Sequence, residues 1–191
     1  MTKERLEAFS DGVMAVAITI MVLDMKVPAG ADLRALAADA PVFAAYALSY
    51  ANVGIFWNNH HHMLRVSQHI DGRVLWANLF LLFWITLIPF EVRWIDDTHI
   101  AALPTATYGL VLIMSAFGYL LLERALIAVN GPNSELATAL GDRRKEYLSL
   151  ALYIAAVGLA FFRPWIAIAI YAAVAAMWFI PDRRIESQLK A

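Results

Sequence analysis

Cysteine is absent from this 191-residue sequence, and charged residues make up only 16% of it. The absence of cysteine excludes disulfides, catalysis by a thiolate and metal clusters held by thiolate ligands. The formal net charge of −1 argues against a nucleic-acid partner, because proteins that bind phosphate backbones normally carry a clear basic excess. Apolar residues are abundant instead, at 61%, with a mean hydropathy of +0.61. Too little polar surface remains to cover a water-soluble globule, so the composition predicts an integral membrane protein.

Long apolar runs divide the chain into six predicted membrane-spanning helices. A helix needs about 20 mostly apolar residues to cross the hydrocarbon core of a bilayer. Turn residues and polar residues separate the runs. The sequence therefore predicts a single all-α domain over 1–191. Its predicted spans lie near 6–26, 41–64, 73–94, 104–128, 146–162 and 164–180. The stretch from Asp32 to Ala40 has room only for a short surface helix.

The placement of Lys and Arg sets the predicted orientation of these spans, because cytoplasmic loops carry an excess of both residues. With both termini inside, the outer side holds few of the fifteen basic residues: Lys26, Arg34, Arg93 and Arg163. The outer side also holds acidic residues, which are Asp24, Asp32, Asp39, Glu91, Asp96 and Asp97. An acidic mouth of this kind, with Asp24 nearest the first span, would raise the local concentration of cations. Ordinary solvated loop charges are the alternative interpretation.

A cleaved signal peptide is the alternative interpretation of the first span, since Lys3 and Arg5 precede the apolar run. Three acidic residues, Glu4, Glu7 and Asp11, interrupt that basic leader. A retained transmembrane helix is therefore the preferred interpretation.

Polar residues gather near the predicted inner ends of the first three spans. Ser10 and Asp11 lie in the first two turns of the first span, where the helix dipole favours an acidic group. Polar atoms at that depth must find partners on neighbouring helices. Trp57 and three histidines end the second span, and Asn78 lies in the third. The sequence therefore predicts a polar cluster of Ser10, Asp11, one histidine and Asn78.

Three adjacent histidines, His60, His61 and His62, also raise the question of a metal or haem site. Successive residues of a helix point about 100 degrees apart, so an intact helix cannot direct all three rings at one ion. No other predicted span supplies a matching histidine, and a structural hydrogen bond by one of the three is preferred. The chain shows no nucleophile paired with a base, no glycine-rich phosphate loop and no paired catalytic carboxylates. We therefore expect neither an enzyme nor a cofactor, and a metal- or haem-binding membrane enzyme is the least favoured alternative.

A second pattern of the first span is the stripe Val16, Thr19, Ile20 and Leu23, which recurs at i, i+3, i+4 and i+7. Such a stripe is more often a packing core than the lining of a pore. A transporter that binds its ion at the midplane normally shows an ionisable group or a broken helix there. None of the six predicted spans shows either feature.

Arg5, Phe9, Ser10 and Asp11, followed by Gly12, resemble the R-x-x-x-F-S-D signature that opens the bacterial branch of the transmembrane protein 175 family. This family consists of potassium-permeable channels. The resemblance covers nearly the whole chain, including the six-span length, the Ala-Ile-Thr run of the first span and the histidine-rich end of the second. Vertebrate members carry two six-helix repeats, so the single motif in this chain implies four subunits.

The resemblance implies a homotetramer in a bacterial plasma membrane that passes potassium and other monovalent cations, with no further cofactor. The first helices would line a central pore through Val16, Thr19, Ile20 and Leu23, the stripe described above. The narrowest ring would fall on Val16, where family members more often carry isoleucine or leucine. Rings of this kind gate by losing water, and the Thr19 hydroxyl is the expected polar contribution.

The resemblance further implies that the signature residues and their partners brace the pore helix against the second and third helices. These bracing residues are Arg5, Phe9, Ser10, Asp11, Trp57, His60, His61 and Asn78. A small secondary transporter or proton-coupled carrier is the alternative function. Such a carrier would need Asp11, Glu123 or a histidine to titrate during transport.

Overall fold

The computed structural model of the chain describes residues 2–134, 136–137 and 144–179, and all regular structure in these ranges is helical. The predicted all-α class is thus confirmed. The helices are α1 (Lys3–Leu23), α2 (Leu33–Ala38), α3 (Ala40–Arg65), α4 (Gly72–Ile85), α5 (Ile88–Asp97), α6 (Ala102–Asn130), α8 (Arg144–Ala160) and α9 (Pro164–Phe179). The predicted end of the last span, at residue 180, lies outside the described residues.

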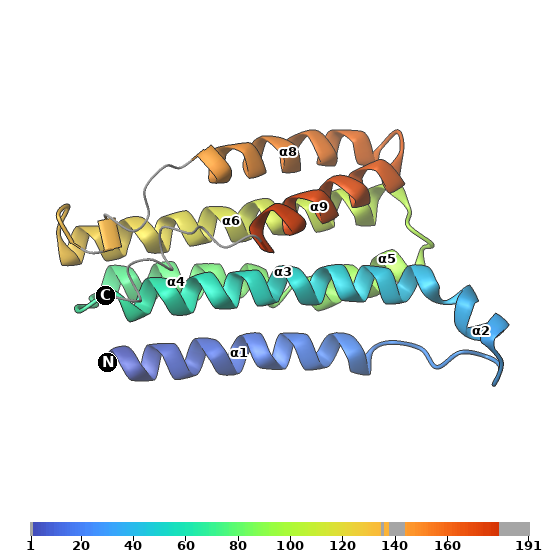
Figure 1. Cartoon of the computed structure of the whole chain (residues 1–191), viewed down its shortest axis with the longest axis horizontal. Coiled ribbons are helices and arrows are strands. Elements are labelled where there is room, and N and C mark those ends of the chain that lie inside the picture. Colours follow the sequence, from blue (N-terminus) through green and yellow to red (C-terminus); the bar gives the residue numbers. More distant parts are fainter. Residues whose placement is uncertain (1, 135, 138–143, 180–191) are drawn as a thin grey trace.

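The long helices run side by side along the longest axis of the molecule (Figure 1). Helix α6 packs against α4, α5, α8 and α9, and therefore forms the centre of the bundle. Helix α1 lies at one edge and packs against α3, α4 and α5, while α8 lies at the opposite edge. The pore helix of the prediction is thus peripheral in a single subunit, with its partners on one side.

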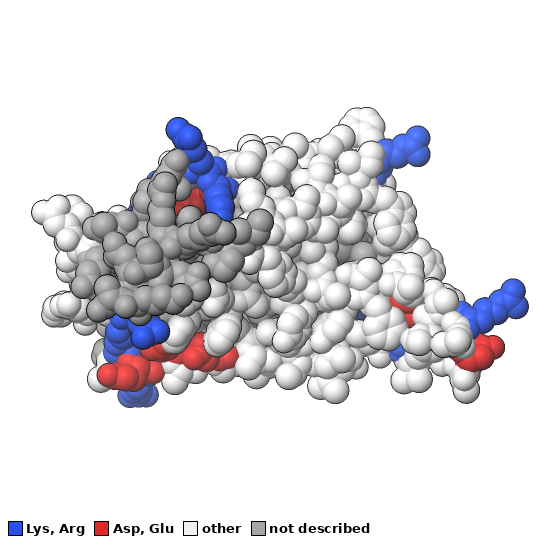
Figure 2. Space-filling model, viewed as in Figure 1, with Lys and Arg blue, Asp and Glu red and all other residues white. Residues whose placement is uncertain are grey.

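The composition of the helices fits a membrane. Three helical segments are long and apolar enough to cross one, namely Lys3–Leu23, Gly72–Asp97 and Ala102–Asn130, and Pro164–Phe179 is a shorter apolar helix. On the face shown in Figure 2, charged side chains lie toward the two ends, and the middle is free of them wherever the residues are described. The number of membrane crossings stays a prediction.

The third predicted span, 73–94, differs from its prediction because it is interrupted between α4 and α5 at Thr86 and Leu87. Pro89 is the cause. It has no backbone N–H, so it cannot donate the helical hydrogen bond to the carbonyl of Ile85. The Leu87 N–H bonds to the Trp84 carbonyl at 3.2 Å, and the Thr86 hydroxyl donates to the Phe83 carbonyl at 2.8 Å. The prediction that no span is broken is therefore wrong for this one.

Two local features follow directly from residue chemistry. The short helix expected after Asp32 is present as α2, and the Asp32 carboxylate caps it by accepting from the Ala35 N–H at 2.8 Å.

Gly118 allows α6 to approach α4 closely, because a Cβ at that position would lie 2.9 Å from the Leu81 Cα. Small residues at helix contacts are a common means of packing helices within membranes.

Candidate functional site: the first helix and its contacts

Helix α1 has two opposite faces. The buried face consists of Leu6, Ser10, Met14, Ala17 and Met21, which recur every three or four residues. The stripe of Val16, Thr19, Ile20 and Leu23 lies on the exposed face; Val16 is 55% exposed and Leu23 is 80% exposed. Within one subunit this stripe is therefore not a packing core.

A buried chain of hydrogen bonds joins α1 to α3 and α4. Ser10, His60 and Asn78 are each fully buried. The Asn78 side-chain amide donates to Ser10 Oγ at 2.9 Å, and Ser10 Oγ donates to the Leu6 carbonyl at 2.8 Å. Asn78 Oδ1 lies 2.8 Å from His60 Nε2. Because this oxygen can only accept, the network assigns the proton of a neutral His60 ring to Nε2.

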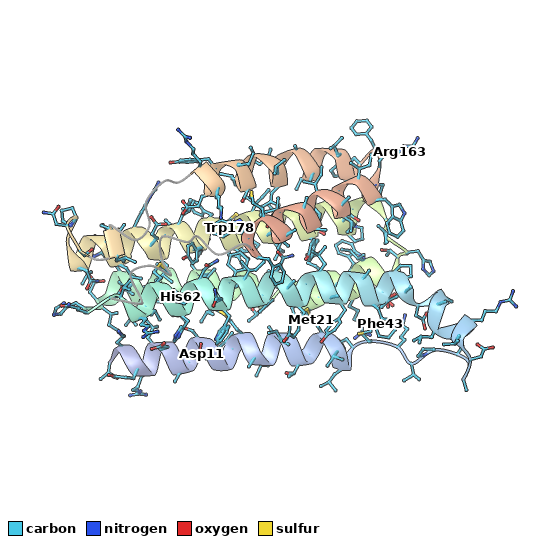
Figure 3. The ribbon with its side chains drawn as sticks, viewed as in Figure 1. Asp11, Met21, Phe43, His62, Arg163 and Trp178 are labelled. Atoms are coloured by element: carbon cyan, nitrogen blue, oxygen red, sulfur yellow. The ribbon has the colours of Figure 1, made fainter. Side chains whose placement is uncertain are left out.

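The structure thus brings three residues of the predicted polar cluster together, but the fourth is elsewhere. Asp11 accepts a hydrogen bond from Trp57 Nε1 at 2.9 Å. Trp57 stacks on His61, with ring centroids 6.2 Å apart, and His61 Nδ1 lies 2.9 Å from a carboxylate oxygen of Glu7. These partly exposed contacts form a second connection between α1 and α3, at the end of α3 that carries His62 (Figure 3). Glu7 lies one turn before Asp11, and that spacing could have identified it.

Arg5 and Phe9 do not join these contacts. Phe9 is 50% exposed, and Arg5 makes no hydrogen bond or ion pair with any described residue. Lys3 does bind α3, because its Nζ donates to the Ser67 carbonyl at 2.9 Å just beyond the end of that helix. A cation is favourable at a helix C-terminus. The bracing role of Arg5 and Phe9 stays a prediction.

The three histidines have different surroundings. His60 lies in the buried chain with Asn78, His61 faces Glu7, and the partly exposed His62 has an edge contact with the His61 ring. No group of three or more side chains of His, Cys, Asp or Glu that could hold a metal occurs among the described residues. The geometry favours structural hydrogen bonding by His60.

The other end of α1 is held by charged side chains. Arg93 of α5 donates to Asp24 at 3.3 Å and lies 3.7 Å from Asp97, and Lys26 pairs with Asp97 at 2.5 Å. The Asp97 carboxylate raises the pKa of Lys26. Asp24 therefore does not present an isolated negative charge at the predicted mouth.

Glu91 also departs from its predicted place in that mouth. It is 6% exposed, and Thr107 of α6 donates to its Oε2 at 2.8 Å. Glu123, named for the alternative carrier, is fully buried on α6. The predicted mouth therefore lacks the Glu91 carboxylate, which lies inside the bundle.

The exposed stripe of α1 borders an open groove of about 850 Å³ between α1 and the junction of α4 with α5. Val16 and Ile20 line one wall of this groove. Thr86, Pro89 and Phe90 line the other. The break in the third predicted span thus lies beside the predicted pore helix.

Another buried polar cluster was missed by the sequence analysis. Tyr108 Oη of α6 accepts a hydrogen bond from the Asn52 amide at 3.1 Å and lies 3.0 Å from Ser49 Oγ. Tyr171 of α9 donates to the Thr105 carbonyl at 3.1 Å. Polar residues that stand singly within apolar runs, such as Asn52, were the sequence signal that could have identified this cluster. These contacts tie α3, α6 and α9 together away from α1.

Comparison with known proteins agrees with the family that the sequence resembles. The model of a family described as the endosomal/lysosomal potassium channel TMEM175 matches residues 5–89. A potassium channel of Chryseobacterium sp. (strain P1-3) is 50% identical over 190 residues, which cover 100% of this chain and 99% of that protein. A potassium channel of Streptomyces collinus (strain DSM 40733 / Tue 365) is 33% identical over 171 residues, which cover 82% of each chain.

The fold is also similar to a solved one. The crystal structure of a lysosomal potassium-selective channel TMEM175 homolog from Chamaesiphon minutus superposes with a TM-score of 0.81. It covers 93% of this chain and 96% of that chain at 24% sequence identity. The arrangement of the helices is therefore a known one.

Proposed function

The chain belongs to the TMEM175 family of channels, and from this premise we propose that four copies assemble into a potassium-permeable pore lined by α1. The family consists of ion channels, which are not enzymes. The names of the two bacterial relatives support potassium as the permeant ion.

The observation that carries the proposal is the exposed face of α1. Its stripe points away from the rest of the subunit, so one copy cannot enclose an ion path with it. Copies related by rotation about an axis beside α1 would bring their stripes face to face. Val16, Ile20 and Leu23 would then form apolar rings, which the same residues cannot form in a monomer.

Apolar rings control ion conduction by determining whether water fills the pore. A narrow neck of branched side chains empties of water, and a cation must then lose hydration to cross it. Thr19 is the polar member of the stripe. Its hydroxyl donates to the Val16 carbonyl at 2.9 Å, so the oxygen keeps lone pairs for a passing cation. A ring of such oxygens would favour cations over anions.

We further propose that the N-terminal end of α1 faces the cytoplasm of a bacterium, with the channel in the plasma membrane. Lys3, Arg5, Arg65 and Arg73 lie at that end, whereas Lys26, Arg34 and Arg93 lie at the end that carries α2. The positive-inside rule supports this orientation. Because the sequence has no cysteine, single cysteines in the loops at the two ends (Ala29→Cys and Gln68→Cys) would each report one side. Labelling of the first alone by an impermeant reagent in intact cells is expected, and the reverse would overturn the orientation.

The proposed function is tested by potassium flux into proteoliposomes, with sodium in parallel. Val16→Asn places an amide in the proposed constriction and is expected to increase the flux. Ile154→Asn is the matched control, because Ile154 is 58% exposed, close to the 55% of Val16, and lies on α8 at the opposite edge of the bundle. Passive, non-saturating flux that Val16→Asn alone increases supports the channel. Flux that requires a counter-ion, or equal effects of both variants, would contradict it.

A further inference from the structure

Glu91 is a buried carboxyl group that neither the pore nor the polar contacts of α1 use. It lies in the first turn of α5, just after the break at Thr86 and Leu87, within the apolar segment Gly72–Asp97. It is 6% exposed. Charged side chains inside a membrane are costly, and those that occur there usually pair with one another or serve a function.

Among the described residues, the Glu91 carboxyl has no ion-pair partner. Helices α1, α3 and α6 pack against α5, and none of them places a basic side chain within ion-pair distance of Glu91 in these ranges. The nearest cation on α5, Arg93, pairs with Asp24 and Asp97. Lys26 also pairs with Asp97.

The tyrosines of the neighbouring helices are engaged elsewhere. Tyr108 of α6 contacts Ser49 and Asn52, and Tyr46 of α3 packs against the Tyr50 ring. Asp39 lies at the start of α3 and is the remaining titratable group at that end of the helix. The hydroxyl of Thr107 is the hydrogen-bond donor that the structure gives the Glu91 side chain.

Thr107 can satisfy Glu91 in either protonation state. Its Oγ lies 2.8 Å from Glu91 Oε2, and also 3.1 Å from the Leu103 carbonyl and 3.0 Å from the Pro104 carbonyl. The hydroxyl can donate to an ionised carboxylate. When Glu91 is protonated, the acid can donate to Thr107 Oγ while the hydroxyl donates to its own helix backbone. A single hydroxyl with three acceptors in reach thus allows the direction of the hydrogen bond to reverse.

We propose that Glu91 and Thr107 form a proton-binding site between α5 and α6, separate from the pore stripe and from the Ser10–Asn78–His60 chain. Burial without a paired cation disfavours the carboxylate, so the site favours the neutral acid. The dipole of α5 acts in the opposite direction, but the Glu91 N–H is already bonded to the Leu87 carbonyl at 3.1 Å. The Glu91 N–H is thus engaged, and Pro89 in the same turn has no N–H to offer a charge.

The position of Glu91 couples this site to α1. Arg93 lies two residues farther along α5 and holds Asp24 at the end of α1. Loss of the proton would place a charge at the contact of α5 with α6 and weaken that contact. This coupling rests on the proposed function, and predicts that the flux of Glu91→Gln no longer changes with pH over the range in which the wild type titrates.

Infrared difference spectroscopy of the full chain in proteoliposomes tests the site without any measurement of conduction. We expect a carbonyl band of a protonated Glu91 carboxyl at neutral pH, which the difference between the wild-type and Glu91→Gln spectra isolates. Glu123→Gln is the matched control, since Glu123 is also buried in the bundle, and should leave the Glu91 band in place. Thr107→Val removes the hydroxyl and should shift the frequency of the band, whereas Thr107→Ser keeps the hydroxyl and should not.

Two results would overturn the site. One is a spectrum at neutral pH in which Glu91→Gln removes only a carboxylate band, because Glu91 would then be ionised. The other is a Glu91 band that Thr107→Val leaves unchanged. Should Glu91→Gln fail to fold, as judged by circular dichroism, the comparison of Thr107→Val with Thr107→Ser still decides between the outcomes. Absence of flux in the wild type would contradict the channel but not this site.

Discussion

The two ends of α1 are held by different kinds of interaction. At the N-terminal end, Ser10, Asn78 and His60 form neutral hydrogen bonds that are fully buried. At the end near α2, Asp24 and Arg93 form an ion pair whose side chains are 34% and 58% exposed. Water and salt screen exposed charges but hardly reach buried neutral groups. The comparison indicates a helix that is fixed at one end and adjustable at the other, next to the broken segment of α4 and α5.

The largest effect is expected from breaking the fixed end with Asn78→Ala. The substitution leaves the buried His60 Nε2–H without its acceptor, and Ser10 Oγ loses the bond that it accepts from Asn78 but keeps its own bond to the Leu6 carbonyl. An unsatisfied buried polar group costs about 1–3 kcal/mol, so we expect a loss of about 1–3 kcal/mol in unfolding free energy in detergent. Asn58→Ala is the matched control, because Asn58 is exposed on α3 two residues before His60. Its unfolding free energy should change little. Equal stability of the two variants would refute the buried anchor.

The packing of α6 against α4, the helix that carries Asn78, can be tested at Gly118. A methyl group there would lie 2.9 Å from the Leu81 Cα, and backbone cannot move aside as a flexible side chain can. Overpacking of this kind costs about 1–3 kcal/mol, so Gly118→Ala should lower the melting temperature. Gly158→Ala on α8 has open space around the new methyl group, and should be neutral or slightly stabilising. A Gly118→Ala protein as stable as Gly158→Ala would show that the α4 backbone can shift to accommodate the methyl group.

The same comparison shows what sequence could and could not predict. The two faces of α1 follow from helical periodicity, and the depth of Ser10 and Asn78 predicted that they would need partners. The separation of Asp11 from that cluster was not predictable, because it depends on the direction in which Trp57 points across from α3. Glu91 was placed at the surface because sequence shows only that it is close to Asp96 and Asp97. Its burial results from the packing of α6 against α5, where Thr107 contacts it, and this is a tertiary effect.

A smaller effect is expected at the adjustable end. Asp24→Asn removes the ion pair with Arg93 and should lower stability by at most about 1 kcal/mol, the usual ceiling for exposed pairs. Because salt screens this pair, the difference between wild type and Asp24→Asn should shrink as the salt concentration rises. The loss caused by Asn78→Ala should not depend on salt. Thermal unfolding of both variants at low and high salt checks the contrast, which fails if the two losses respond alike.

The smallest effect concerns Asp71, an acidic cap near the fixed end. Asp71 precedes α4, where its carboxylate accepts from the N–H groups of Val74 and Arg73 at 3.1 and 2.9 Å and pairs with the Arg73 side chain. The Val74 N–H, together with the Arg73 side chain, lowers the pKa of Asp71.

A carboxyl whose pKa is lower in the folded state stabilises the fold fully above its unfolded pKa, about 3.9 for Asp. The stabilisation is lost as the pH falls through the folded pKa. Asp71→Asn keeps a capping oxygen but has no charge to titrate. Asp71→Asn should therefore be less stable than wild type at neutral pH. The difference in unfolding free energy should vanish in acid. A difference that persists at a pH well below 3.9 would mean that Asp71 acts through packing instead of through its charge. In that case the fixed end of α1 would depend on neutral contacts throughout.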